Sequence, residues 1–264
     1  MKLRINILLF FLAVSFLTTL FAQDYIVVNK HNVTYTFVSS DENTDGFIKF
    51  GFPTWEEETF EVFEQVKDSS GIAIDLGAWI GTTAIWLSKH FSHVIAVDAD
   101  RLSIFWLEKN LKASQCYNVS ICDKAVTAKN QYVIFGPRGD VLNQSISYIK
   151  EMFEKDTDYV VQAITFDQLI NEYVYGNEAL SSKKVSFIKC DIEGGEEGII
   201  EDMLRFALAH NAKVYLSFHL DWWKTKSIDN LSMLFSLFKS NCPSENICEY
   251  IRQNPFTSIL FEPL

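Results

Sequence analysis

Short apolar runs alternate with amphipathic stretches along most of the chain, and this alternation limits the fold more than any other feature of the sequence. The apolar runs have strand length and β-branched content, whereas the stretches between them repeat apolar residues at helical spacing. The expected strands are 71–76, 93–98, 118–126, 185–192 and 213–218, and the expected helices are 81–91, 103–114 and 196–210. Continuous apolar strands joined by helices are typical of a parallel sheet that is covered on both faces. The pattern therefore predicts an α/β fold.

The segments around this pattern are less regular. Residues 23–66 contain short β-like pieces, the last of them at 47–50, and then an acidic helical segment, so we interpret them as a β lead-in with a helix. Residues 67–264 form the main domain, in which 127–182 adds irregular strands. Near the C-terminus we expect a helix at 229–240 and closing strands at 247–252 and 258–262.

Residues 1–22 differ from the rest of the chain. No charged residue occurs between Ile7 and Ala22, and only Lys2 and Arg4 precede this run. A basic start, an apolar run and a final small residue are the layout of a secretory signal peptide, here with cleavage after Ala22. The run of 16 residues is also close to the roughly 17 that a spanning helix needs, so a retained signal-anchor and an ordinary buried helix remain alternatives. Either targeting role would send the domain into the secretory pathway or tether it to a membrane.

Charge and cysteine content bear on partners and compartment. The chain has 23 Lys and Arg against 34 Asp and Glu, a net charge of −11. Sequence-independent binding to nucleic acid requires clustered cations that displace counterions from phosphates, so we expect no nucleic-acid partner. Cys242 and Cys248 flank a turn-like stretch and could pair in an oxidising lumen, which the sequence leaves open. No motif indicates an oligomeric state.

A turn with two glycines follows the first expected strand. The sequence Asp75-Leu76-Gly77-Ala78-Trp79-Ile80-Gly81 ends that strand and begins a helix, so a ligand can lie against bare backbone at the helix N-terminus. Asp98 ends the next strand, 21 residues after Gly77, where a carboxylate can accept hydrogen bonds from both hydroxyls of a ribose. The alternative is a tight βα turn in which Asp98 only caps the following helix.

The glycine spacing of this turn distinguishes between two candidate ligands, a dinucleotide and S-adenosylmethionine. A dinucleotide site has the pattern G-x-G-x-x-G, whereas this turn has G-x-x-x-G and carries Asp75 two residues before its first glycine. That carboxylate would repel a pyrophosphate but suits a cation. S-adenosylmethionine combines an ammonium, a sulfonium and a ribose, so the sequence favours it as the cofactor. An NAD-dependent oxidoreductase remains the alternative.

Several motifs resemble those of known methyltransferases. The turn, followed by Ala-Val-Asp-Ala-Asp at 96–100, looks like the cofactor-binding start of class I methyltransferases. Trp55-Glu56 with Thr59, Cys-Asp-Lys-Ala-Val at 122–126 and Lys-Cys-Asp-Ile-Glu-Gly-Gly-Glu at 189–196 extend the resemblance to the FkbM-type family over residues 50–220. One departure is Trp79, where the family usually has Asn.

The resemblance implies a fold and an activity. The fold would be a Rossmann-like class I methyltransferase sandwich, with a mostly parallel sheet of seven strands, one antiparallel strand near an edge and helices on both faces. The activity would be transfer of a methyl group from S-adenosylmethionine to a hydroxyl of a sugar, a glycan or another hydroxylated small molecule. Residue by residue, Gly77, Ala78 and Gly81 would cradle the cofactor, Asp75 would lie near its methionine part, Asp98 would hold the ribose and Asp123 would lie near the adenine amino group.

Residues on the acceptor side are expected at the carboxyl ends of the strands at 185–192 and 213–218. A hydroxyl acceptor must lose its proton, so a base near it assists transfer. Asp191 and Glu193 stand two apart and would face the same way if their strand continues that far, and His219 ends the next strand. Two carboxylates and a histidine could also hold a divalent metal. Their spacing fits no metal-site pattern, so we predict no metal; a non-catalytic binding domain remains a further alternative.

Overall fold

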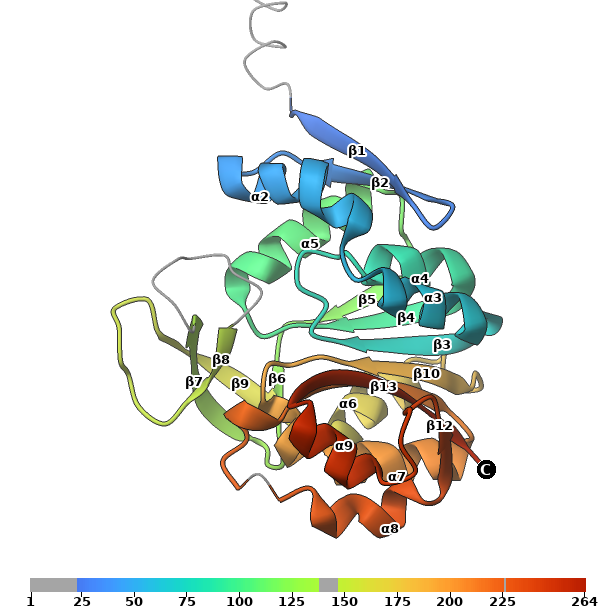
Figure 1. Ribbon diagram of the computed structural model, residues 1–264. Coiled ribbons are helices and arrows are strands. Elements are labelled where there is room, and N and C mark those ends of the chain that lie inside the picture. The colour runs from blue at the N-terminus through green and yellow to red at the C-terminus, as the bar shows by residue number, and fades with distance from the viewer. Residues whose placement is uncertain (1–22, 138–146, 226) are drawn as a thin grey trace, which may run out of the picture. The chain divides into compact units, whose positions relative to one another are not determined.

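The computed structural model describes residues 23–137, 147–225 and 227–264 (Figure 1). The charge-free run at 7–22 lies outside these residues, so the proposed signal or anchor is not tested by the structure. Within the part of the chain that is described, no helix combines the length and the apolar character needed to cross a membrane. The chain divides into two compact units between Trp55 and Glu56.

The first unit is a hairpin followed by helical turns. Strands β1 (Tyr25–Lys30) and β2 (Val33–Val38) pair antiparallel, and the buried rings of Tyr35, Phe37 and Phe52 pack together. Helix α2 (Glu42–Gly46) begins after Asp41, whose carboxylate accepts hydrogen bonds from the first turn, and a π-helical turn (Phe47–Gly51) and a 3-10 turn (Phe52–Thr54) follow it. The strand predicted at 47–50 is therefore wrong, because the capped helix continues through it.

The second unit is built on a seven-stranded sheet with the order β12-β13-β11-β10-β3-β4-β5. These strands are β3 (Asp68–Leu76), β4 (Phe91–Val97), β5 (Val119–Cys122), β10 (Val185–Cys190), β11 (Lys213–His219), β12 (Phe238–Ser240) and β13 (Phe256–Pro263). Neighbours from β5 to β11 pair in parallel, and β13 pairs antiparallel with both β11 and β12. Counted along the chain, the order is 3-2-1-4-5-7-6. The expected sheet of seven strands with one antiparallel strand next to an edge is confirmed.

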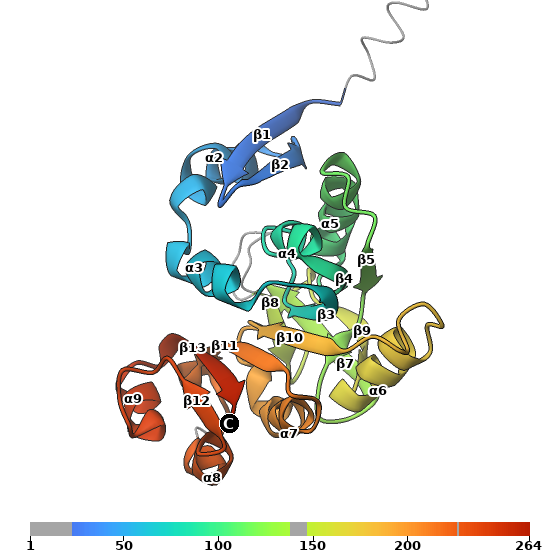
Figure 2. The same cartoon turned by 90° about the vertical axis from the view of Figure 1, so that its right-hand side faces the viewer.

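Helices cover both faces of this sheet (Figure 2). One face is covered by α3 (Glu57–Val66), α4 (Ala84–His90) and α5 (Arg101–Ala113), and the other by α6 (Phe166–Ile170), α7 (Ile200–His210), α8 (Ser232–Phe235) and α9 (Ile247–Gln253). The ring of Phe63 on α3 contacts those of Trp86, Phe187 and Tyr215, which places this helix within the second unit. The boundary between the units thus lies before α3 rather than after residue 66.

The C-terminal elements differ from the expected ones. The segment 229–240 is not one helix: a 3-10 turn (Asp229–Leu231) leads into the short α8, and the last residues form the edge strand β12. The segment 247–252 is helix α9 rather than a strand, because the Asn246 side chain accepts a hydrogen bond from the Glu249 backbone and caps it. The strand expected at 258–262 is confirmed as β13.

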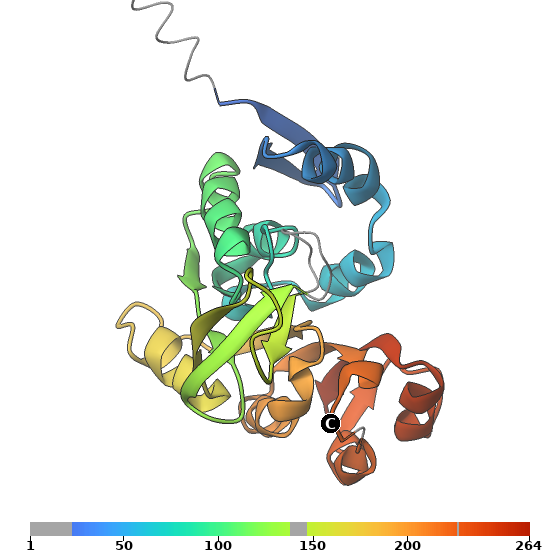
Figure 3. The ribbon, with the colours of Figure 1, turned by 90° about the vertical axis from the view of Figure 1, so that its left-hand side faces the viewer.

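A second, four-stranded sheet comes from the irregular middle of the chain (Figure 3). It has the order β6-β9-β7-β8, with β6 (Ala125–Val126), β7 (Gln131–Pro137), β8 (Ser147–Lys150) and β9 (Tyr159–Ile164). The strand expected at 118–126 is split, since β5 joins the large sheet and β6 joins this one. All five cysteines are thiols, so the Cys242–Cys248 pairing left open by the sequence is not formed.

Candidate active site

The turn after β3 has a backbone that only glycine accommodates at its first position. Gly77 has a φ of +81°, and a Cβ atom there would lie 1.8 Å from the carbonyl oxygen of Asp191. The backbone N–H groups of Gly77 and Ala78 both donate to the Val97 carbonyl, at 2.9 and 3.0 Å. Gly81 has a φ of +98°. The glycines therefore allow the chain to turn sharply beneath the end of β10 and against the end of β4.

Asp98 lies directly after β4 and is hydrogen-bonded to the same turn. Its carboxylate accepts the backbone N–H of Trp79 at 2.8 Å and that of Asp100 at 2.8 Å. Burial raises the pKa of Asp98 to about 6, because desolvation outweighs these hydrogen bonds. At pH 7 and above the group is mostly ionised and can accept further hydrogen bonds. Trp79 has a φ of +47°, a left-handed conformation that Asn tolerates better than Trp.

Asp75 is fully buried and forms part of an ionic network beneath the turn. The Thr83 hydroxyl donates to one of its oxygens at 2.7 Å, and the Nζ atom of Lys189 lies 3.3 Å from the other. Burial raises the pKa of Asp75, although the Lys189 ammonium and the hydrogen bond from Thr83 oppose this rise. The same Nζ atom donates to the Gly77 carbonyl at 2.8 Å and lies 3.9 Å from an oxygen of Asp191. The sequence did not single out Lys189, although it is the first residue of the 189–196 motif.

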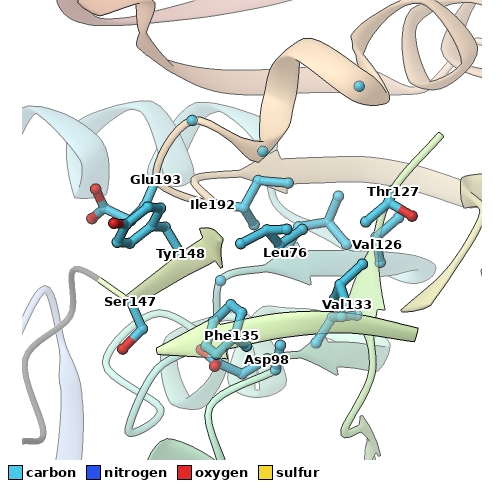
Figure 4. A pocket seen from close by; sticks show the side chains of 18 of the residues that line it. Leu76, Asp98, Val126, Thr127, Val133, Phe135, Ser147, Tyr148, Ile192 and Glu193 are labelled. Carbon is cyan, nitrogen blue, oxygen red and sulfur yellow. The ribbon is translucent and has the colours of Figure 1, made fainter. Parts of the chain in front are cut away.

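A cavity of about 700 Å³ lies at the carboxyl ends of β3, β4 and β10 and extends to the four-stranded sheet (Figure 4). Leu76, Asp98, Ile192 and Glu193 face it from the large sheet, and Val126, Val133, Phe135 and Tyr148 face it from the small one. Among the residues that the structure describes, five carboxylates line the cavity, those of Asp98, Asp100, Asp191, Glu193 and Glu197, together with three lysines, Lys124, Lys129 and Lys224. Its volume lies in the range of ligand pockets, roughly 300–1,000 Å³.

Asp191 and Glu193 converge on His219, but not for the reason that the sequence suggested. Strand β10 ends at Cys190, so the alternation of a strand does not extend to these two residues. Instead Glu193 has a φ of +56° and Gly194 a φ of +97°, and this left-handed turn brings the Glu193 carboxylate back towards Asp191. The Nε2 atom of His219 lies 3.5 Å from an Asp191 oxygen and 3.6 Å from a Glu193 oxygen.

Glu196 holds this arrangement together from a fully buried position. Its two oxygens accept the backbone N–H groups of Ile192 and Gly194, each at 2.9 Å, and the indole N–H of Trp223 at 3.3 Å. The Nδ1 atom of His219 lies 2.9 Å from the same carboxylate and donates to it. Burial alone would lower the pKa of His219, but Glu196 and the neighbouring carboxylates outweigh burial and raise it. The sequence placed Glu196 in a motif without identifying this function.

Trp222, the residue before Trp223, lines the cavity. Its ring stacks on that of His219, with centroids 5.0 Å apart and planes within 5° of each other. The ring of Phe256 packs edge-on against Trp222 at 5.1 Å. Trp222 thus links the cavity lining to the His219 and Phe256 rings that pack against it.

The predicted site residues divide by whether they line the cavity. Gly77, Asp98, Asp191 and Glu193 do, whereas Asp75, Ala78, Gly81 and His219 support the lining from behind. Asp123 is not brought to this cavity. It borders a separate hollow of about 300 Å³ together with residues that include Arg101 and Gln162, which gives its predicted contact with adenine no support.

The acidic cluster contains groups that could ligate a metal ion. One potential ligand atom from each of Asp191, Glu196 and His219 lies within 4.8 Å of the others. In this geometry the Glu196 oxygen nearest to His219 already accepts the Ile192 backbone N–H. The prediction that no metal is bound is not tested by the structure.

No model of a known protein family matches the chain, and no curated protein sequence matches it. Solved structures give weak similarities. An rRNA methylase from Streptococcus thermophilus aligns at 10% identity and a TM-score of 0.46, over 78% of this chain and 95% of that one. A methyltransferase FkbM from Methylobacillus flagellatus aligns at 14% identity and a TM-score of 0.45, over 84% of this chain and 55% of that one. A protein from Streptococcus mutans, described as a methyltransferase in complex with SAH, aligns at 14% identity and a TM-score of 0.45, over 78% of this chain and 96% of that one. Similarities this low assign no function, and the strand order is what establishes the fold.

Proposed function

We propose that this protein is an S-adenosylmethionine-dependent methyltransferase that acts on a hydroxyl oxygen of a sugar, a glycan or another hydroxylated small molecule. One observation carries the proposal. The Gly77 turn and the Asp98 carboxylate open onto the same cavity as the Asp191–Glu193 pair, so a donor and an acceptor can lie side by side. The fold, which matches the class I methyltransferase expectation, agrees with this assignment.

The residues present fit this cofactor. A Cβ atom at Gly77 would collide with the Asp191 carbonyl, so the turn stays bare backbone at the cavity wall. Asp98 is mostly ionised at neutral pH and can accept ribose hydroxyls. Among the described residues that line the cavity, carboxylates outnumber lysines, which favours a cation such as a sulfonium over a pyrophosphate. The same balance disfavours the NAD-dependent alternative.

When bound, S-adenosylmethionine would supply an electrophilic methyl group for direct in-line transfer. The contribution of the chain would be to position the acceptor oxygen and to accept its proton. Asp191 and Glu193 line the cavity and can accept a hydrogen bond from a hydroxyl. His219 lies behind them with a raised pKa, so it would orient and charge-balance the pair rather than act as the base itself. The Trp222 ring, which lines the cavity, would offer an apolar contact to a sugar.

Titration of the purified full-length chain with S-adenosylmethionine and, separately, with NAD tests the cofactor. We expect saturable binding of S-adenosylmethionine and none of NAD; binding of NAD alone would overturn the proposal. Transfer of a labelled methyl group is then measured against oligosaccharides, polyols and RNA. Label on a carbohydrate or polyol hydroxyl is expected, and label on RNA alone would refute both the acceptor class and the expected absence of a nucleic-acid partner.

The doubly substituted variant Asp191→Asn, Glu193→Gln tests the acceptor side. It should lose at least ~100-fold in transfer rate, a loss in the range attributed to general base catalysis. Its affinity for S-adenosylmethionine should fall by much less than the transfer rate, since the Gly77 turn and Asp98 are unchanged. Glu201→Gln is the matched control, because Glu201 is an exposed carboxylate on α7 that pairs with Arg205. Unchanged transfer in the double variant would remove both carboxylates from the reaction.

We also propose that residues 1–22 direct the domain into the secretory pathway or tether it to a membrane, on the basis of their basic start and charge-free run. N-terminal sequencing of the protein purified from its own cells distinguishes the outcomes. A mature chain that begins at Gln23 indicates a cleaved signal, and an intact chain in the membrane fraction indicates an anchor. An intact chain in the soluble fraction would refute both.

A further inference from the structure

Lys189 lies where the two halves of the candidate site meet, and its side chain is only 4% exposed. Its Nζ atom donates to the Gly77 carbonyl at 2.8 Å and lies 3.4 Å from the Leu76 carbonyl. The carboxylates of Asp75 and Asp191 lie 3.3 and 3.9 Å away. One cation therefore contacts the turn on the donor side and a carboxylate on the acceptor side.

The backbone joins these two loops at the same point. The Asp191 N–H donates to the Leu76 carbonyl at 3.0 Å, and the Asp191 carbonyl lies so close to Gly77 that a Cβ atom could not be inserted. Neutralising Asp75 would by itself require only one contact from Lys189. The shortest Nζ contact is instead the one to the Gly77 carbonyl, which carries no net charge. A buried ammonium needs oxygen partners for its donors, and here those partners come from both loops.

We infer that Lys189 is a positioning residue that holds the Gly77 turn and Asp191 in a fixed relation, so that donor and acceptor are aligned. This inference rests on the proposed function for what the two loops bind, whereas the coupling of the loops is a property of the protein alone. Removal of Lys189 should loosen both loops together. Because alignment of the reacting atoms is the main catalytic contribution of such a site, the rate of transfer should fall further than the affinity for the cofactor.

The variant Lys189→Met removes the cation but leaves Asp75 buried without it, which can prevent folding. The paired variant Asp75→Asn, Lys189→Met removes both charges and separates the two functions of the lysine. A matched control is Asp158→Asn, Lys150→Met, because that ion pair of 2.8 Å also has both side chains fully buried but lies in the four-stranded sheet. Amide hydrogen exchange is followed in peptides that cover 77–83 and 190–196, without ligand, and S-adenosylmethionine is then titrated.

We expect exchange at both loops to accelerate at least tenfold in the Asp75–Lys189 variant and to remain at the wild-type rate in the control. Affinity for S-adenosylmethionine should fall about tenfold and kcat about 100-fold. Wild-type exchange, affinity and kcat in the Asp75–Lys189 variant would show that Lys189 only balances Asp75 and would overturn the inference. If the wild-type protein binds no S-adenosylmethionine, the proposed function fails, and the exchange rates alone then support or overturn the coupling.

Discussion

Substitution of Gly77 by alanine should be far more damaging than the loss of one glycine normally is. Its φ of +81° lies in the left-handed region, which costs an alanine about 1–2 kcal/mol. The new methyl group would also lie 1.8 Å from the Asp191 carbonyl oxygen, so one of the two loops must move. Forcing extra atoms into a packed site costs ~1–3 kcal/mol. Together we expect a loss of about 2–5 kcal/mol in the free energy of unfolding.

Two other glycines in the same unit separate these contributions. Gly81 also has a positive φ, +98°, but its new methyl group would meet side-chain ends rather than backbone, those of Leu107 at 3.1 Å and Ile85 at 3.5 Å. Gly81→Ala should therefore cost about 1–2 kcal/mol from the backbone alone. Gly198 has no positive φ, and its nearest neighbour is the Ala128 backbone nitrogen at 3.5 Å. Gly198→Ala should stay within about 1 kcal/mol of wild type.

The assay is urea unfolding followed by circular dichroism, at one pH and protein concentration for all four proteins. At an m-value of about 2 kcal/mol/M, the Gly77→Ala midpoint should fall by about 1–2.5 M. The same variant should bind S-adenosylmethionine more weakly, because the turn that faces the cavity must shift. A midpoint for Gly77→Ala equal to that of Gly81→Ala would refute the close approach of Gly77 and Asp191, and with it the packing of the two loops.

Three further predictions concern single groups of the site. Affinity for S-adenosylmethionine should decrease as the pH falls through about 6, because Asp98 becomes protonated. In the Asp98→Asn variant, titrated between pH 5 and 8, this pH dependence should vanish. If it persists, another group is responsible for it. The raised pKa of His219 gives stability that is fully present below pH ~6.5 and lost as the pH rises through the folded-state pKa. Urea unfolding should therefore show a larger deficit for His219→Gln at pH 6 than at pH 9, and a constant deficit would contradict the assigned contacts. Glu196→Gln should destabilise by ~1–3 kcal/mol, because an amide N–H₂ would face buried N–H donors; a thermal midpoint equal to wild type would exclude that acceptor role.

The sheet was predictable because its strands are buried on both faces and leave continuous apolar runs. The runs at 71–76, 185–192 and 213–218 correspond to β3, β10 and β11 with small shifts at the ends. The errors occur where short apolar runs lack that context. Residues 247–252 carry strand-like apolar residues, but a capping contact from the Asn246 side chain starts a helix there. At 47–50 the helix begun after Asp41 continues into a π-helical turn through an aromatic, strand-like sequence. Local capping prevailed over composition in both cases.

The donor half of the candidate site was predictable from spacing, because a glycine turn and a carboxylate at neighbouring strand ends meet whenever the strands are parallel. Residues that act from beneath the cavity left a weaker signal. Lys189 left one, because it interrupts an otherwise apolar strand. A lysine is seldom buried without a partner, so its position indicates a buried carboxylate nearby. The fully buried Glu196 gave none, because Glu at the start of a helix is normally exposed and needs no explanation.

The sequence pattern brought Asp191, Glu193 and His219 together correctly, but for an incorrect reason. The alternation of a strand would have placed the two carboxylates on one face, but β10 ends before either of them. Their convergence depends on the left-handed conformations of Glu193 and Gly194 and on the Glu196 carboxylate that binds the same loop. Geometry of that kind depends on contacts distant in sequence, such as the one between Glu196 and His219. The acceptor half of the site is therefore set by tertiary structure, and substitutions at Glu196 should disturb it without replacing any residue that lines the cavity.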